Sequence, residues 1–535
     1  MITDILVCVL MLCSCDKVDR SGWVIPDKED PSGPDTGLVV PDGLTDFAAG
    51  KFYLFDTDAV SGYSDVEPLS PWTSGTRLTD DAVGTGYGSR TSVGWMGDKV
   101  EIVVDLGSVR NVENIFVHSF NDAAASVLFP GKIEVQYAED KESVWSQAEG
   151  AIAFDGSKSA AWGELVLPKV DCRYVKLVLT SADAAKVMMV DEVKVFGKFE
   201  PDLKYVPESG CYHGAFNNGT SFADNTDPEI VITNKACPID TYESLVGKQL
   251  SMMLWYQSFT NASGQLRYFD EMQKARAQHS GIAYDGRYRF FLYGWLPDDY
   301  TAAQLAGGRL DEYLDRYFRE ISESAGVADM GPVWFRPANE MNSNWLTYTG
   351  DPVNYVKFWR RMYNIAEQYG LTGYNVFVWS PNDVTFNGSN HVMPDAVMSD
   401  FYPGDIYVDW VGVSCYPTSR AGYQWPENLL KEVSILAAEH GKPLMISEGG
   451  YGQQVPDADK PEWVTAFFDE IKKLGIKAFI WENHKTDANG DRRIHVFPDA
   501  LEAYRDAVSD SYFLDMIPDY VYQEIETRKN TLPHE

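Results

Sequence analysis

The stretch VWFRPANE (residues 333–340) carries the clearest information about the fold. It is a short apolar run that ends in polar residues, which is typical of a buried parallel strand with functional side chains at its carboxyl end. The stretch LMISEGG (residues 444–450) repeats this pattern later in the chain. Each of the two places one glutamate, Glu340 or Glu448, just after an apolar run. A fold of short buried strands with polar ends is therefore expected.

Eight such apolar runs follow one another from about residue 204. They lie near Cys211 and at 250–256, 288–295, 333–337, 375–380, 408–416, 443–448 and 476–481. Their starts are roughly 33 to 45 residues apart, which leaves room for a crossover helix each time. Helical patterns occur at 309–325, 352–370, 427–440 and 462–474. Eight strand-then-helix units predict an α/β fold, a (β/α)8 or TIM barrel, over residues 204–515.

Residues 42–199 show a different, all-β pattern. Runs with a period of two occur at 100–106, 131–137, 174–179 and 192–196. They predict an N-terminal antiparallel β-sandwich domain in front of the barrel. Residues 16–41 are rich in Asp, Pro, Gly and Ser and are expected to form a flexible linker. Residues 516–535 are expected to form a C-terminal tail.

The first fifteen residues resemble a bacterial lipoprotein signal peptide. The apolar stretch 5–11 is too short to span a bilayer and runs into Leu12-Cys13-Ser14-Cys15. The resemblance implies lipidation of Cys15. We therefore expect an exported protein that is lipid-anchored to the bacterial cell envelope, at the outer membrane, on its surface or periplasmic side.

The charge balance excludes one large class of partners. The chain has 45 Lys and Arg against 79 Asp and Glu, a formal net charge of −34. Binding to nucleic acid needs a surplus of basic residues, so no nucleic acid partner is expected. The same charge argues against polyanionic glycans. Aromatic residues make up 13% of the chain, which suits either sugar-binding sites or an aromatic core.

The cysteines and histidines predict no cofactor and no catalytic metal. Beyond the first fifteen residues the cysteines are Cys172, Cys211, Cys237 and Cys415, without a C-x-x-C pair. Buried free thiols are expected, and a disulfide between Cys211 and Cys237 is the alternative in an oxidising compartment. The eight histidines are dispersed, without an H-x-x-H spacing.

Glu340 and Glu448 are the candidate catalytic residues. They follow the fourth and seventh predicted strands, and TIM-barrel chemistry occurs at the carboxyl ends of strands. Two carboxyl groups about 5–5.5 Å apart are what retaining glycoside hydrolysis requires. Glu340 would be the acid/base and Glu448 the nucleophile. The alternative is that one or both form a structural ion pair, for example with Arg336, because a buried carboxylate needs a partner.

The predicted barrel resembles glycoside hydrolase family 26, the β-mannanase family, over residues 204–510. The matching stretches are 212–216, 255–257, 336–342 with Trp345, 378–382, 402–409, 414–416 and 447–450. The resemblance implies a retaining endo-β-glycosidase acting on a neutral plant or microbial β-glycan, polysaccharide or oligosaccharide. An endo-1,4-β-mannanase is the first expectation.

The resemblance also implies supporting roles. Tyr416 would hydrogen-bond the nucleophile, and Arg336 would orient the carboxylates. Trp345 and Trp481 would offer their flat faces to sugar rings. His213 would either line the cleft or cap the first strand.

Two further residues near the strand ends have two interpretations each, and a third departs from the family pattern. Trp379 is either a core residue or a substrate contact, and Glu482 is either a binding or a structural residue rather than a catalytic one. Asn339 stands where the family usually has His, and its amide would hydrogen-bond the sugar 2-hydroxyl. This substitution leaves β-glucan, β-xylan and β-galactan open as substrates.

The N-terminal domain resembles a coagulation-factor type C, or discoidin-like, domain. The matching stretches are 78–81, 103–107, 173–177 and 191–195. The resemblance implies a carbohydrate-binding module with Trp72, Tyr87 and Trp95 as ligand contacts, or else a spacer with core aromatics. Asp80 and Asp81 could hold a structural calcium ion. A surface glycan-binding lipoprotein with an inactive barrel is the non-enzymatic alternative.

Overall fold

The computed structural model describes residues 38, 43–60, 63, 75–88, 91–217, 238–279, 286–324, 331–385, 397–417, 424–486, 490–530 and 532. The chain divides into two compact units. Pro201–Phe358 and Tyr369–Glu535 belong to the first unit, and Val24–Glu200 with Trp359–Gln368 belong to the second.

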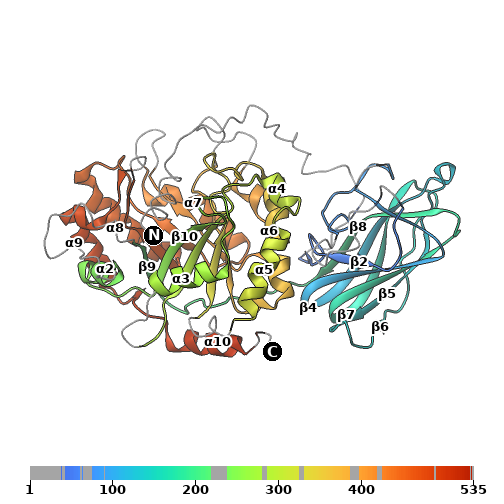
Figure 1. Ribbon diagram of the computed structural model, residues 1–535, viewed down its shortest axis with the longest axis horizontal. Coiled ribbons are helices and arrows are strands. Elements are labelled where there is room, and N and C mark those ends of the chain that lie inside the picture. Colours follow the sequence, from blue (N-terminus) through green and yellow to red (C-terminus); the bar gives the residue numbers. More distant parts are fainter. Residues whose placement is uncertain are drawn as a thin grey trace. The chain divides into compact units, whose positions relative to one another are not determined.

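The first unit is built on a closed parallel barrel (Figure 1). Its strands are β9 (Cys211–Phe216), β10 (Met252–Ser258), β11 (Phe290–Leu296), β12 (Val333–Pro337), β13 (Val376–Trp379), β14 (Trp410–Val411), β15 (Ser414–Cys415), β16 (Met445–Gly449) and β17 (Ala478–Glu482). The short strands β14 and β15 are two parts of one chain segment, which pairs with β13 on one side and with β16 on the other. Because β17 also pairs with β9, eight strand positions close into a ring. The predicted (β/α)8 fold is confirmed.

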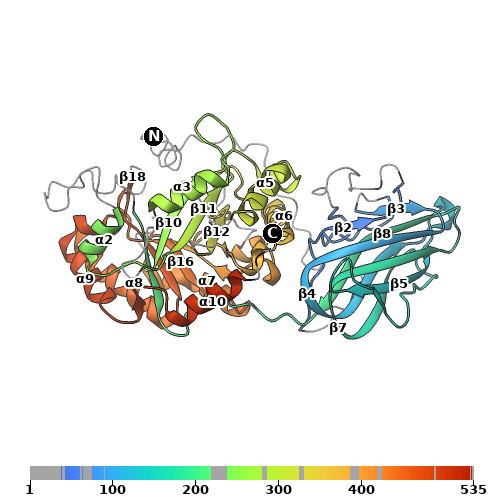
Figure 2. The same ribbon diagram turned by 60° about the horizontal axis from the view of Figure 1, so that its bottom comes forward.

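Helices follow the strands along the chain. They are α2 (Pro238–Val246), α3 (Phe269–His279), α4 (Ala302–Ala306), α5 (Asp311–Ser322), α6 (Pro352–Gln368), α7 (Pro426–Glu439), α8 (Lys460–Leu474) and α9 (Pro498–Val508). The four predicted helical ranges coincide with α5, α6, α7 and α8. Figure 2 shows α3 and α5 outside the neighbouring strands β10, β11 and β12. In α5 the buried residues Leu314, Phe318 and Ile321 form one apolar face, as an amphipathic helix against a sheet requires.

The segment expected to be a C-terminal tail is ordered. It contains helix α10 (Asp519–Lys529), whose Val521 and Ile525 are fully buried. Just before it, β20 (Phe513–Leu514) pairs with β9. The helix is therefore packed onto the first unit rather than extending from it. In the described part of the chain, no helix combines the length and the apolar character that crossing a bilayer requires.

The second unit contains an antiparallel sheet in the order β1-β8-β4-β7-β5-β6. Its strands are β1 (Thr45–Asp46), β4 (Lys99–Phe120), β5 (Pro130–Ala138), β6 (Ser146–Gln147), β7 (Ala160–Ser181) and β8 (Val187–Gly197), and β2 (Tyr53–Phe55) and β3 (Val93–Met96) pair with β4 and β8. The four predicted strands lie within β4, β5, β7 and β8. This arrangement fits the predicted β-sandwich.

The aromatic residues proposed as ligand contacts of the sandwich are only partly suited to that role. Trp95 is fully buried and packs edge-on against Phe55, with ring centroids 5.3 Å apart. It is a core residue, so its assignment to a binding loop is wrong. Tyr87 is partly buried against an apolar cluster that includes Phe120 and Met189. Trp72 lies outside the described residues.

The acidic pair proposed as calcium ligands is arranged differently from a metal site. Asp81 accepts a hydrogen bond from the Lys194 ammonium at 2.5 Å, and Asp80 accepts one from the backbone N–H of Ala82 at 3.1 Å. Among the described residues, no group of three or more His, Cys, Asp or Glu side chains is placed to hold a metal ion.

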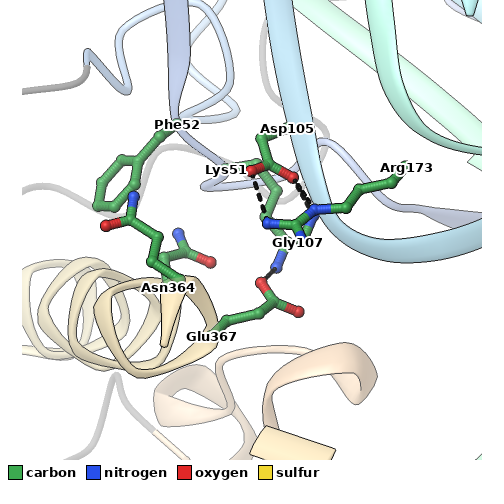
Figure 3. A pocket seen from close by; sticks show the side chains of 8 residues that line it. Lys51, Phe52, Asp105, Gly107, Arg173, Asn364 and Glu367 are labelled. Carbon is green, nitrogen blue, oxygen red and sulfur yellow. Dashed lines mark hydrogen bonds and ion pairs between the residues drawn. The ribbon is translucent and has the colours of Figure 1, made fainter. Parts of the chain in front are cut away.

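The second unit also contains a small pocket whose charged groups are paired (Figure 3). The Lys51 ammonium lies 2.5 Å from a Glu367 carboxylate oxygen, and both side chains are buried. Arg173 binds Asp105 with two hydrogen bonds of 2.8 and 3.0 Å. Because these charges neutralise one another, we interpret the pocket as a structural feature.

The cysteines that the structure describes are buried free thiols, in agreement with the first of the two expectations. They are Cys172, Cys211 and Cys415. Cys237 and Cys15 lie outside the described residues, so lipidation of Cys15 stays a prediction.

Candidate active site

The backbone just after β12 is strained. Ala338 has φ = +46° and Glu340 has φ = +56°, both in the left-handed region that disfavours residues with a Cβ atom. The turn is held by a hydrogen bond from the Glu340 N–H to the Ser380 carbonyl at 2.8 Å. Strain of this kind collects at functional sites, where the surrounding structure fixes it.

Each carboxylate oxygen of Glu340 accepts one hydrogen bond from a neutral donor. The indole N–H of Trp345 donates to Oε2 at 2.8 Å, and the Asn382 amide donates to Oε1 at 3.2 Å. The Trp345 side chain is 42% exposed, as a sugar platform would be. The role of Asn382 was missed, although it belongs to the WSPN stretch (residues 379–382) after the fifth strand.

The strand that carries Glu448 contains a β-bulge. The pairing of β16 with β17 shifts by one residue between Ile446 and Gly449. The N–H groups of Ser447 and Glu448 both point at the Val413 carbonyl, at 3.0 and 3.5 Å. Bulges of this kind re-aim a side chain next to an active site.

Glu448 is held by a cation and a hydroxyl. Its Oε1 accepts hydrogen bonds from Arg336 Nη2 at 2.9 Å and from Ser414 Oγ at 2.5 Å. Arg336 is fully buried, and its Nε donates to Ser380 Oγ at 2.9 Å. Since the Ser380 carbonyl also holds the Glu340 backbone, a continuous set of hydrogen bonds links the two glutamates. Arg336 thus both pairs with a carboxylate and orients it.

Tyr416 does not contact Glu448 as expected. Its hydroxyl donates to Glu482 Oε2 at 2.6 Å. Arg492 donates to the same oxygen, and its guanidinium carbon lies 3.9 Å from the centre of the Tyr416 ring. Glu482, at the end of β17, is the acceptor in place of Glu448. Arg492 was missed because it follows the hairpin β18 (Lys485–Thr486) and β19 (Gly490–Asp491) rather than a barrel strand.

The buried position of Glu448 affects its proton affinity. Burial raises the pKa of the Glu448 carboxyl well above its usual range, and the Glu482 carboxylate adds to this effect, whereas Arg492 opposes it. Burial also lowers the pKa of the Arg336 guanidinium to about 10, so Arg336 remains a cation at neutral pH. Arg336 and Ser414 donate to the ionised form of Glu448, which is the form a nucleophile needs.

Trp481 is not available to a sugar ring. It is fully buried, and its ring centroid lies 5.7 Å from that of Phe467 on α8 and 5.4 Å from that of Tyr504 on α9. Successive side chains of a strand point to opposite faces, so Trp481 faces the helices whereas Glu482 faces Tyr416. The expectation of a sugar platform at Trp481 is wrong.

His213 and Trp379 are core residues. The His213 ring nitrogens lie 2.8 Å from the Gln249 carbonyl and 2.9 Å from the Tyr504 hydroxyl. Burial lowers the pKa of His213 to about 3, so it is neutral. The cleft-lining alternative for His213 is therefore wrong. Trp379 is fully buried and donates its indole N–H to the Phe401 carbonyl at 3.0 Å.

Asn339 is buried next to Glu340, and its side-chain oxygen makes no hydrogen bond to any described residue. Its backbone carbonyl accepts a hydrogen bond from the Tyr348 hydroxyl at 2.8 Å, which fixes the position of the residue. A buried polar atom without a partner costs free energy. A bound hydroxyl group would supply that partner.

We expect Trp345→Phe to lower kcat roughly 10-fold with little change in KM, because Glu340 loses one donor but the aromatic face remains. Steady-state kinetics on a glycan substrate would check this. Trp145→Phe, at a partly buried tryptophan of the sandwich, is the control. An increase in KM at constant kcat would instead assign the indole N–H to substrate binding.

A parallel barrel with glutamates at the ends of its fourth and seventh strands has the architecture that a glycoside hydrolase barrel requires. The family comparison is more specific. The model of glycosyl hydrolase family 26 matches residues 301–442, a stretch of the barrel that includes Glu340.

Curated relatives cover part of the chain. Endoglucanase H of Acetivibrio thermocellus is 27% identical over 287 residues, which are 50% of this chain and 29% of that protein. Beta-1,3-xylanase TXYA of a Vibrio species is 21% identical over 244 residues, 39% of this chain and 49% of that protein. The chain thus spans less than half the length of these relatives. A solved family 26 β-mannanase from Bacteroides ovatus covers 58% of this chain and 92% of its own, at 15% identity and a TM-score of 0.39.

Proposed function

We propose that the protein is a retaining endo-β-glycosidase in which Glu448 is the nucleophile and Glu340 the acid/base. The observation that supports this most is the difference between the surroundings of the two buried glutamates. Glu448 accepts a hydrogen bond from the Arg336 cation, whereas Glu340 accepts hydrogen bonds only from the neutral donors Trp345 and Asn382. A nucleophile must stay ionised, and an acid/base must exchange its proton during each cycle.

The substrate we propose is a neutral β-glycan with an equatorial 2-hydroxyl group, with β-glucan first and β-xylan second. Asn339 supports this choice, because an amide replaces the usual histidine beside the acid/base. The names of the curated relatives, an endoglucanase and a β-1,3-xylanase, point in the same direction. Mannan, whose 2-hydroxyl is axial, is the alternative substrate because of the family resemblance.

The test is an assay of residues 16–535 against mixed-linkage β-glucan, β-1,3-xylan, β-mannan and β-galactan. Short oligosaccharides released from glucan or xylan, with the β-anomer formed first in proton NMR, would support the proposal. Release from mannan alone would make mannan the substrate instead. An α-anomer as first product would contradict the retaining mechanism, and binding without any cleavage would favour the glycan-binding alternative.

The Asn339→His variant tests the role proposed for Asn339. We expect kcat/KM on the preferred glucan or xylan to fall by roughly 10 to 100-fold, since one buried polar contact is worth about 1–3 kcal/mol. The ratio of mannan to glucan cleavage should rise. Equal losses on all substrates would contradict a specificity role and leave only a packing defect, which a melting curve would reveal.

We further infer that the chain is exported and anchored through a lipid on Cys15, with the β-sandwich as a carbohydrate-binding module. The tetrapeptide LCSC (residues 12–15) supports the anchor. Expression of the full chain with a radiolabelled fatty acid tests it: the label should enter the wild type and be absent from Cys15→Ser.

A further inference from the structure

The end of the eighth strand carries a third buried carboxylate. Glu482 is 8% exposed, and its Oε2 is shared by Tyr416 and Arg492. The Arg492 guanidinium stacks on the Tyr416 ring and is itself buried. These three residues form one rigid cluster, which we call the Glu482 cluster.

The backbone fixes the Glu482 cluster from two sides. The Arg492 N–H donates to the His484 carbonyl at 3.0 Å, and the Arg492 carbonyl accepts the Trp481 indole N–H at 3.1 Å. These two bonds fix the backbone of Arg492 next to the end of β17. No described residue donates to the second carboxylate oxygen, Oε1.

The cluster adjoins Glu448. The strands β16 and β17 are paired, with Gly449 opposite Trp481. Glu448 directly precedes Gly449 in the sequence, and Glu482 directly follows Trp481. Glu482 and Arg492 both act electrostatically on Glu448, with opposite signs. The other groups around Glu448 are the Arg336 cation and the Ser414 hydroxyl, and Tyr416 and Glu340 also interact electrostatically with Arg336.

We propose that Glu482 is a positioning residue that, together with Arg492, sets the pH range over which Glu448 works as a nucleophile. This inference rests on the proposed role of Glu448. The Glu482 carboxylate repels negative charge on Glu448 and so favours its protonated form, whereas Arg492 favours the anion. Glu482 also accepts the hydrogen bond of the Tyr416 hydroxyl, which could otherwise donate to the Glu448 anion.

Removing the charge of Glu482 should lower the pH at which Glu448 ionises, so the acid limb of the kcat/KM profile of Glu482→Gln should move down by roughly one pH unit. Glu482→Asp retains the charge and should keep the limb near that of the wild type. Arg492→Gln removes the opposing cation and should move the limb up.

The matched control is Glu243→Gln. Glu243 is a buried carboxylate that binds the Arg289 guanidinium at 2.8 Å, but it lies at the amino ends of the strands, where it also accepts from the Leu250 N–H. Losing this pair should lower the melting temperature without moving the acid limb. If Glu482→Gln does not fold, Arg492→Gln still tests the proposal through its upward shift.

A second measurement separates this inference from the proposed function. Carbon-13 labelling of glutamate carboxyls, with the Glu448 signal assigned by its loss in Glu448→Gln, gives the ionisation of Glu448 without substrate. A downward shift of that titration in Glu482→Gln supports the inference even if the wild type cleaves no glycan, in which case only the proposed function fails. Unchanged titrations in Glu482→Gln and Arg492→Gln, or shifts in the same direction, would overturn it.

Discussion

Glu448→Gln is expected to lower kcat/KM by at least roughly 10⁴-fold, because the amide retains the shape of the side chain but cannot attack the anomeric carbon. Its hydrogen bonds from Arg336 and Ser414 go to Oε1, which glutamine retains as a carbonyl oxygen, so the fold should be preserved. Steady-state assays on the cleaved glycan, together with a melting curve, check both parts. Glu243→Gln serves as the buried-carboxylate control here too.

The result for Glu448→Gln also discriminates between the enzyme and the glycan-binding alternative. A variant that binds the glycan as tightly as its active parent but does not cleave it supports catalysis by the barrel. Activity within 10-fold of the wild type would rule Glu448 out as the nucleophile, since no other described group could replace a covalent attack so efficiently.

Glu340→Ala is expected to have the second largest effect, a loss of roughly 10² to 10⁴-fold on polysaccharide. The loss should be much smaller on an aryl glycoside with an acidic phenol, because such a leaving group departs without protonation. Added azide should accelerate the second step and yield a β-glycosyl azide, since the missing side chain leaves room for a small anion. The measurement is kcat on both substrates, with and without azide.

The comparison of leaving groups is the internal control for Glu340. Equal losses on the polysaccharide and the aryl glycoside would mean that the variant damages the site as a whole, for example by releasing the strained turn at 338–340. Such a result would contradict the assignment of Glu340 as acid.

The barrel could be predicted because its signals are local and repeated. Each buried strand is a compact apolar run, and helices such as α5 and α6 carry a clear apolar stripe. Glu340 and Glu448 could be predicted because they form a pair, one directly after the fourth and one at the end of the seventh buried strand, where a retaining hydrolase places its two carboxylates. The hydrogen-bond partners of the two glutamates, Asn382 and Ser414, could not be predicted, since they lie on or just after other strands.

The error at Trp481 has its physical origin in the burial of β17. A parallel strand that is buried on both faces has no alternation of polar and apolar residues, so its inward and outward positions cannot be read from the sequence. In β17 all five residues are buried, and Glu482 rather than Trp481 takes the inward position. The β-bulge at Glu448 has no sequence signature either, because it depends on the pairing of two strands.

The left-handed turn at Ala338 and Glu340 has a consequence for engineering this domain. Each such residue stores about 1–3 kcal/mol of conformational energy, a sizeable part of the margin by which domains stay folded. A selection for heat resistance would therefore favour glycine at position 338, where the missing Cβ removes the steric cost. A substitution that relaxes residues 338–340 would raise the melting temperature but would also hold Glu340 less firmly. The variants with the highest melting temperature therefore need not have the highest kcat.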